Sequence, residues 1–309
     1  MDKLIMIWAT TILLVGCLDN KNKKSPTEII RDIVDGTPQD LPLPNPDPAP
    51  SPRPDVLPKC SEYCNTKKGL LKAVDDYAFM SFVNFGYRGI GRCRGHAIIT
   101  QNLSKLAYFD KNDRSCEASD YNSECSSIAL EKVKNILNYQ AQKIPGFSDI
   151  YTLSQHPKIN AYLKMRVRSI SHKYSARSVR INNPRYENEF KNIFYEIIRR
   201  IEKHHEPYIG IKGFSIGDHA LLGYEYKKTS YGDTICVRDS NYIPMYGLNC
   251  QSILYMEDDK IFYKRADLSA TQLFIFNLMT DEDARVTKYE AAQKSYCLAN
   301  APVEGHCSL

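Results

Sequence analysis

Apolar residues divide the chain into a short N-terminal run, a polar proline-rich stretch and a long region with the patterns of helices and strands. The apolar run extends from Leu4 to Val15 and follows the positively charged Lys3. A membrane-spanning helix needs roughly 20 apolar residues, so this run is too short to span, and no second such run follows it. The pattern predicts a lipoprotein-type signal peptide over residues 1–16 and an exported protein.

A small residue and a cysteine stand where the apolar run stops. The tetrad Leu14, Val15, Gly16, Cys17 resembles the lipobox of bacterial lipoproteins. The resemblance implies cleavage before Cys17 and attachment of a lipid to it, which would hold the protein at a membrane because each buried methylene of an acyl chain adds about 0.8 kcal/mol. A plain secreted protein cleaved nearby is the alternative. By the family's sorting rules, Leu18 in the next position favours the outer membrane of the cell envelope.

Residues 17–59 are polar, with a proline at every second position from Pro42 to Pro54. Such a sequence favours the extended polyproline II conformation. At about 3.1 Å per residue its proline-rich part reaches on the order of 40 Å. We therefore expect a lipidated tether over residues 17–59. Residues 60–309 are long enough to form one domain with a substantial core.

Three patterns within residues 60–309 predict a domain of mixed helix and strand. Residues 187–204 carry apolar side chains at the spacing of one helical face. Short apolar stretches follow between 207 and 243, and a polar turn near 228–233 separates two of them, which is typical of antiparallel strands. A glycine-rich stretch precedes Cys93 and apolar residues at helical spacing follow it, which predicts that a further helix begins at Cys93.

The ten cysteines narrow the search for a reactive thiol. Export puts them in a disulfide-permissive compartment, and nine remain if Cys17 is lipidated. Nine is odd, so at least one is unpaired, and Cys93 is the one without a close partner in sequence. A metal site at Cys60 and Cys64 would need a second pair of closely spaced Cys or His residues, and the sequence contains no matching pair. The disulfide candidates are Cys60 with Cys64, Cys116 with Cys125, Cys236 with Cys250, and Cys297 with Cys307. Sequence spacing alone does not determine which of these cysteines are joined.

The surroundings of Cys93 are those of a nucleophile. A helix N-terminus and the flanking arginines favour thiolate over thiol. His219 opens one predicted strand and Asp239 ends the next, so antiparallel pairing can bring them side by side. The acid would then hold the imidazole in the tautomer that takes the thiol proton. Asn241 is the alternative to Asp239, and an unreacted structural thiol is the alternative reading of Cys93.

This order of parts resembles the papain-like cysteine peptidases. The cysteine at a helix start, a later helix, a strand led by Pro207, then HALLGY and DSNY follow the family's sequence of cysteine, histidine and acid over about residues 80–245. The distance from Cys93 to His219 is close to the family's spacing of about 130–150 residues. The resemblance implies an α+β papain-like fold, in which a helical part bearing the nucleophile helix packs against an antiparallel β part.

The resemblance further implies a thiol peptidase that cleaves amides through a thioester, with a peptide or protein substrate and with no metal or organic cofactor. Its pattern is incomplete, because no glutamine precedes Cys93 to complete the oxyanion hole. Asn84 and Tyr87 are the nearby candidates beside the Cys93 amide, and a missing donor could cost about 3 to 4 kcal/mol. A degenerate binding module and a cell-wall peptide amidase or transpeptidase are therefore the alternative functions.

A basic segment from Met165 to Arg180 is the one feature that suggests an anionic partner. Such runs are usually solvated helix faces, and the formal net charge of +5 is modest. We therefore expect no nucleic-acid partner, and a membrane contact only through the N-terminal lipid. The sequence does not predict an oligomeric state.

Overall fold

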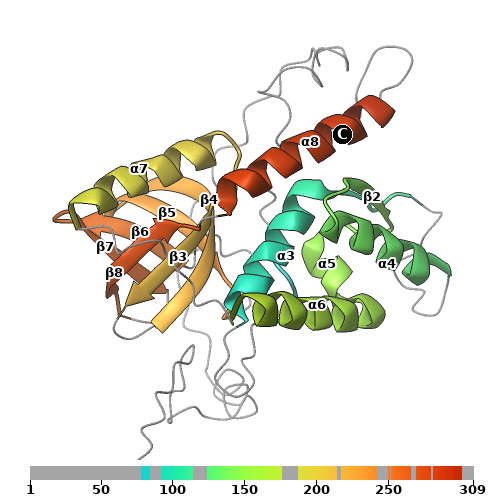
Figure 1. The fold of residues 1–309 in the computed structure, drawn as a ribbon, viewed down its shortest axis with the longest axis horizontal. Coiled ribbons are helices and arrows are strands. Elements are labelled where there is room, and N and C mark those ends of the chain that lie inside the picture. The colour runs from blue at the N-terminus through green and yellow to red at the C-terminus, as the bar shows by residue number, and fades with distance from the viewer. Residues whose placement is uncertain are drawn as a thin grey trace, which may run out of the picture.

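The computed structural model of the protein describes residues 78–83, 92–113, 124–175, 187–213, 217–241, 250, 252–265, 269–279 and 281–300. The chain forms a helical half and a β half, which meet along helix α3 (Cys93–Leu106) (Figure 1). The signal peptide and tether predicted for residues 1–59 lie outside the described residues. Within these ranges no helix combines the length and the apolar character that crossing a membrane requires.

The helical half is built around α3. Its other elements are the short parallel strands β1 (Ala107–Asp110) and β2 (Gln142–Pro145) and the helices α4 (Glu124–Leu137), α5 (Ile150–Gln155) and α6 (Pro157–Ser175). The α3 side chains Ile99, Leu103 and Leu106 are fully buried in one apolar cluster with residues of the other helices. Burying a side chain of this size contributes about 1.5–3 kcal/mol, so the cluster fixes α3 in its half.

The β half is a closed antiparallel barrel. Its strands are β3 (Tyr208–Gly213), β4 (Gly217–Thr229), β5 (Gly232–Asp239), β6 (Ser252–Glu257), β7 (Lys260–Arg265) and β8 (Thr271–Leu278). Consecutive strands pair, and β3 also pairs with β8, which closes the ring. Helix α7 (Glu187–Glu202) packs its apolar face, including Phe190 and Phe194, into the same core cluster as the barrel strands.

Helix α8 (Glu282–Asn300) returns the chain from the barrel to the helical half. It begins beside the barrel and runs across α3 (Figure 1). Buried polar residues, rather than an apolar stripe, make much of its contact with α3. The barrel and the helical half are therefore joined twice, by the chain before β3 and by α8.

The local sequence predictions are confirmed, and the fold expected from the family resemblance is wrong. Helix α7, the helix start at Cys93 and the β4–β5 hairpin with its turn at 230–231 lie where the patterns predict them. The strands, however, do not form the β part of a papain-like helix-plus-sheet fold, because they close into a six-stranded barrel. Closure depends on β6 to β8, which come after the part of the chain that carried the resemblance. Alternation of polar and apolar residues also cannot reveal that β3 bonds to strands on both of its edges.

Candidate active site

Helix α3 presents a thiol at its N-terminus. Cys93 is the first residue of the helix and keeps a thiol rather than forming a disulfide. It is only 8 % exposed. Its predecessor Arg92 occupies the N-cap position without a capping side-chain hydrogen bond. The positive end of the helix macrodipole therefore acts on this sulfur at close range.

The barrel presents an imidazole and a carboxylate as one hydrogen-bonded unit. His219 lies on β4 and Asp239 is the last residue of β5, and the register pairs Asp239 with Leu221. His219 Nε2 lies 2.7 Å from Asp239 Oδ1, and both side chains are 2 % exposed. A hydrogen bond between charged partners at this distance is among the stronger ones in proteins.

Two further groups hold the carboxylate of Asp239. The Tyr263 hydroxyl on β7 donates to Oδ2, and the backbone N–H of Asn241 donates to Oδ1 at 2.8 Å. The Asn241 side-chain amide lies 3.3 Å from His219 Nε2, farther than the carboxylate. Asp239 is thus the nearer of the two predicted orienting residues, and Asn241 supports it through the main chain.

The charges of this unit are mutually stabilised. Burial would lower the pKa of His219, but the charge of Asp239, the hydrogen bond to it and the side chain of Cys93 raise this pKa to about 10. Burial would raise the pKa of Asp239, but His219, Tyr263 and the Asn241 amide lower it to about 2. At neutral pH the pair is therefore an imidazolium facing a carboxylate.

Cys93 interacts with the imidazole of His219. Nε2 faces Asp239, and Nδ1 is buried with no hydrogen bond of standard geometry within the described part of the chain. The Cys93 side chain nevertheless raises the pKa of His219 by its charge and as a hydrogen-bond partner. The thiol at the start of α3 and the imidazole on β4 therefore lie within interacting distance of each other.

His96 lies one turn after the thiol on α3 and is buried close to Cys93, His219 and Asp239. Its Nε2 is 3.0 Å from the Phe82 carbonyl oxygen, and its Nδ1 is 3.4 Å from the Thr100 hydroxyl. Burial lowers the pKa of His96 to about 4, although the Phe82 hydrogen bond and the charge of Asp239 act against this. His96 is therefore neutral at pH 7, and its ring is held by these contacts.

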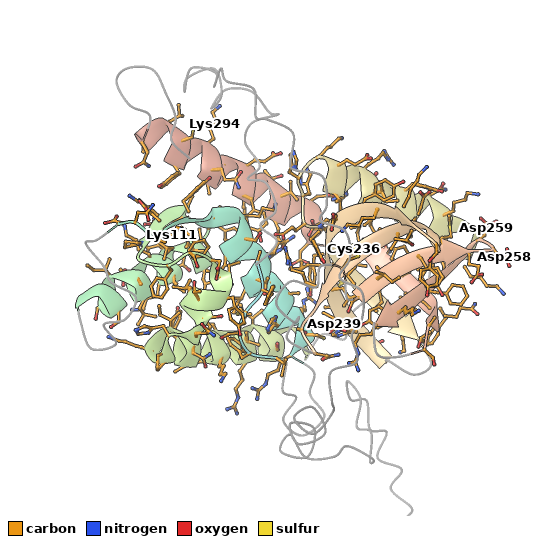
Figure 2. All side chains as sticks on the ribbon, turned by 180° about the vertical axis from the view of Figure 1, so that it is seen from behind. Lys111, Cys236, Asp239, Asp258, Asp259 and Lys294 are labelled. Atoms are coloured by element: carbon orange, nitrogen blue, oxygen red, sulfur yellow. A yellow bond between two sulfur atoms is a disulfide. The ribbon has the colours of Figure 1, made fainter. Side chains whose placement is uncertain are left out.

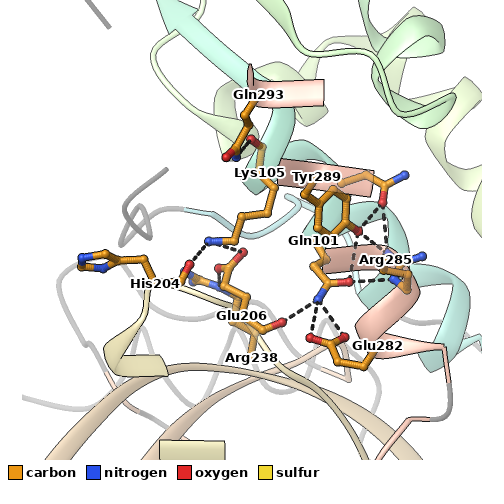
Figure 3. A network of polar contacts seen from close by, with 10 residues as sticks. Gln101, Lys105, His204, Glu206, Arg238, Glu282, Arg285, Tyr289 and Gln293 are labelled. Carbon is orange, nitrogen blue, oxygen red and sulfur yellow. Dashed lines mark hydrogen bonds and ion pairs between the residues drawn. The ribbon is translucent and has the colours of Figure 1, made fainter. Parts of the chain in front are cut away.

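A buried polar network fastens α3 to the barrel (Figure 3). Lys105 Nζ donates to the His204 carbonyl at 2.6 Å and lies 4.0 Å from Glu206 Oε2. Arg238 on β5 pairs with Glu206 Oε1 at 3.4 Å. The Gln101 amide donates to the Glu206 carbonyl oxygen at 2.6 Å. Because Arg238 directly precedes the orienting acid, the network links the helix that carries the thiol to the strand that carries the acid.

The same network continues into α8. The Gln101 amide lies 3.2 Å from Glu282 Oε2, and Arg285 donates to Gln101 Oε1 at 2.9 Å and to Asn102 Oδ1 at 3.0 Å (Figure 3). Burial raises the pKa of Glu282 to about 7, against the opposing effects of Gln101 and Arg285. α3 is thus held by polar side chains from both the barrel and the C-terminal helix.

Several predicted positions lie outside the described residues. These are the oxyanion candidates Asn84 and Tyr87, the lipidation candidate Cys17, and the cysteines Cys60, Cys64, Cys116 and Cys307, together with the side chain of Cys125. A disulfide joins Cys236 on β5 to Cys250, and Figure 2 labels Cys236 in the barrel. Cys297 on α8 is also disulfide-bonded. In the described ranges no group of three or more His, Cys, Asp or Glu side chains is placed to hold a metal ion.

Tyr263 and the α3 network are the parts of the site that sequence reasoning missed. Tyr263 lies 24 residues after its partner Asp239, on a strand with no motif of its own. β7 lies two strands along from β5 in the barrel, so no local sequence signal links it to the end of β5. Comparisons with protein-family models, with curated proteins and with solved structures find no match to this chain.

Proposed function

We propose that the chain is a cysteine hydrolase of amide bonds, a peptidase or amidase, with Cys93 as nucleophile, His219 as acid and base, and Asp239 as the orienting acid. The observation that carries the proposal is the position of His219 between two groups, with its Nε2 bonded to Asp239 and its imidazole interacting with the Cys93 side chain. A nucleophile, a base and an orienter in this order are the signature of nucleophilic catalysis.

The reaction follows from these atoms. The Cys93 thiolate attacks the amide carbonyl carbon, and the carbonyl oxygen takes up the negative charge near the N-terminus of α3. The C–N bond then breaks while His219 gives its proton to the leaving amine, which leaves a thioester and a neutral imidazole. His219 next takes a proton from water as the water attacks the thioester. The acid product leaves, and the thiolate and imidazolium are restored.

Electrostatics at the site favour this cycle. Since the thiol raises the pKa of His219, the imidazolium in turn stabilises the thiolate. Cys93, His219 and Asp239 are 8 %, 6 % and 8 % exposed, so water screens their charges little. No cofactor is part of the proposal. Lipidation at Cys17 would put the activity outside the cytoplasm, at the cell envelope, with a peptide or protein as substrate.

Acyl transfer to an amine uses the same residues, so a cell-wall peptide transpeptidase or amidase is the same proposal with a different acceptor or substrate. A binding module without catalysis is the alternative from another class. The two classes differ in one property, because only the hydrolase forms an acyl-enzyme on Cys93.

The test is incubation of the full chain with a mixed peptide library and with cell-wall peptides, followed by mass spectrometry of both products and protein. We expect new amide-cleavage products and, after acid quenching, an acyl adduct on Cys93. Cys93→Ser should abolish both while the protein stays folded. Absence of products and of the adduct, with a folded protein, would favour the binding module.

A further inference from the structure

Helix α3 lacks a cap of its own at the end that carries the thiol. The first amides of a helix have no partner inside it and are usually satisfied by a Ser, Thr, Asp or Asn at the N-cap. Here Arg92 is the N-cap residue, and its side chain makes no capping bond. The third amide of the helix, that of Gly95, is the one an N-cap side chain normally serves.

A serine from another helix takes that place. Ser171 lies near the end of α6, 4 % exposed, and its hydroxyl accepts the Gly95 N–H at 3.2 Å. The same hydroxyl donates to the Arg92 carbonyl oxygen at 3.4 Å, which also accepts the His96 N–H at 3.0 Å. One hydroxyl therefore contacts the main chain on both sides of Cys93.

Glycine at position 95 is what allows this contact. A Cβ on Gly95 would lie 2.3 Å from the Val167 carbonyl oxygen and 2.6 Å from the Ser171 hydroxyl. The first of these atoms is backbone and cannot move aside without shifting α6. The N-terminus of α3 and the main chain of α6 are thus in contact at this point, closely enough for a short serine side chain to bridge them.

We propose that Ser171 is a positioning residue of the active site, a cap supplied by α6 that fixes the peptide units on either side of Cys93. It directs the sulfur toward the imidazole of His219 and holds the first amides of α3 toward the carbonyl oxygen of a substrate. Ser171 itself uses only the Gly95 amide and leaves those of Cys93 and Arg94 to other partners. The inference rests on the proposed Cys93–His219 pair.

The experiment measures alkylation of Cys93 by iodoacetamide between pH 4 and 8 in the full chain, with the labelled position found by mass spectrometry. For Ser171→Ala we expect labelling at pH 5 to slow about tenfold, the effect of one lost hydrogen bond on the geometry of the ion pair. The matched control is Ser154→Ala, which removes another buried hydroxyl of the same half, one that accepts the Ser81 N–H at 2.7 Å. This control should label like wild type.

A second pair of variants isolates the hydroxyl at constant size. Ser171→Thr keeps the oxygen and should label close to wild type, whereas Ser171→Val, of the same shape, should label about tenfold more slowly than Ser171→Thr. The inference would be overturned if Ser171→Ala and Ser154→Ala labelled at the same rate. It would also be overturned if Ser171→Thr and Ser171→Val labelled at the same rate. A wild-type Cys93 that labels as an ordinary thiol would overturn the proposed function as well, so the two failures can be told apart.

Discussion

The two halves of the molecule place their functional groups by different means. In the barrel, His219 and Asp239 are joined directly by side-chain bonds, with Tyr263 from a third strand behind them. In the helical half, Cys93 is held through the main chain of α3, by helix packing and by the Ser171 hydroxyl. The base and its acid are therefore a property of the barrel alone, whereas the position of the thiol depends on how the halves dock.

This difference gives the interface between the halves a functional meaning. The polar network through Gln101, Lys105 and Glu206 requires one defined arrangement of α3 on the barrel, since buried charges need their partners. Apolar contacts alone would tolerate small slides of the helix. Changes in the barrel pair should therefore alter chemistry most, and changes in the network should alter stability most.

The largest expected effect comes from breaking the barrel pair. Asp239→Asn replaces a charge-assisted hydrogen bond to His219 by a neutral one, and we expect turnover of a cleaved peptide to fall by about 100-fold while the fold is retained. The control is Asp218→Asn, on the same hairpin, whose carboxylate is 39 % exposed and pairs with Lys212. Steady-state kinetics of both variants decide the point, and similar losses in the two would contradict the orienting role.

The network should matter chiefly for stability. Glu206→Gln leaves Lys105 and Arg238 buried with a neutral partner, and we expect the free energy of unfolding to fall by about 3 kcal/mol. Urea unfolding measures this. Glu225→Gln breaks an ion pair with Lys227 whose side chains are 37 % and 40 % exposed, and should cost at most about 1 kcal/mol. Equal losses would show that the network contributes no more than a surface pair.

The disulfide restrains the barrel half only. Replacing both Cys236 and Cys250 by Ala opens a link across a sequence separation of 14 and should lower the free energy of unfolding by about 3 kcal/mol. Because the bond lies in the barrel, the alkylation rate of Cys93 in the folded variant should stay at its wild-type value. A slower rate would mean that the barrel pair itself has moved.

The pH dependence of stability separates the network from the site. The pKa of Glu282 is raised to about 7 in the folded protein, so its contribution is fully present below pH 4.5 and is lost as the pH rises through 7, by about 2–3 kcal/mol. Urea midpoints of wild type and Glu282→Gln between pH 4.5 and 7.5 measure it. A flat difference between the two across this range would contradict the assignment.

The two members of the His219–Asp239 pair lose their stabilisation in pH ranges that differ from that of Glu282. The contribution of Asp239 to the free energy of unfolding is present above pH 3.8 and is lost as the pH falls through about 2, because the pKa of Asp239 is lowered in the folded protein. The contribution of His219 is present below pH 6.5 and is lost as the pH rises through about 10, because its pKa is raised in the folded protein. Between pH 4 and 6.5 both contributions are fully present. A change of the free energy of unfolding with pH in that range therefore comes from other groups, such as Glu282.

The smallest expected effect is that of Tyr263. Tyr263→Phe removes one hydrogen bond to the Asp239 carboxylate, and we expect a loss of about 1.5 kcal/mol in unfolding free energy and a fall in turnover of about tenfold. Tyr255→Phe is the control, because this buried barrel tyrosine stacks on Phe262 away from the acid. If the control lowers turnover equally, the hydroxyl of Tyr263 has no special role.

The sequence was sufficient to predict helix α7, the start of α3, the β4–β5 hairpin and the three central residues of the candidate site, because helix starts, hairpins and strand ends leave periodic and turn signals. It could not predict barrel closure, since edge pairing between β3 and β8 joins residues some 65 positions apart without a local pattern. For the same reason it missed Tyr263 and Ser171, each of which meets its partner only through tertiary packing. The tether and the lipid site remain sequence predictions.

The most direct test of the central claim is the pH dependence of Cys93 alkylation by iodoacetamide, compared between wild type and His219→Ala. With the pKa of His219 raised to about 10, the histidine stays charged from pH 4 to 8 and stabilises the thiolate, so wild-type labelling at acidic pH should be much faster than that of an ordinary thiol. His219→Ala should label slowly at pH 4 and accelerate about tenfold per pH unit, as an ordinary thiol with a pKa near 8.5 does. Coincident profiles for the two proteins would contradict the thiolate–imidazolium pair on which the account depends.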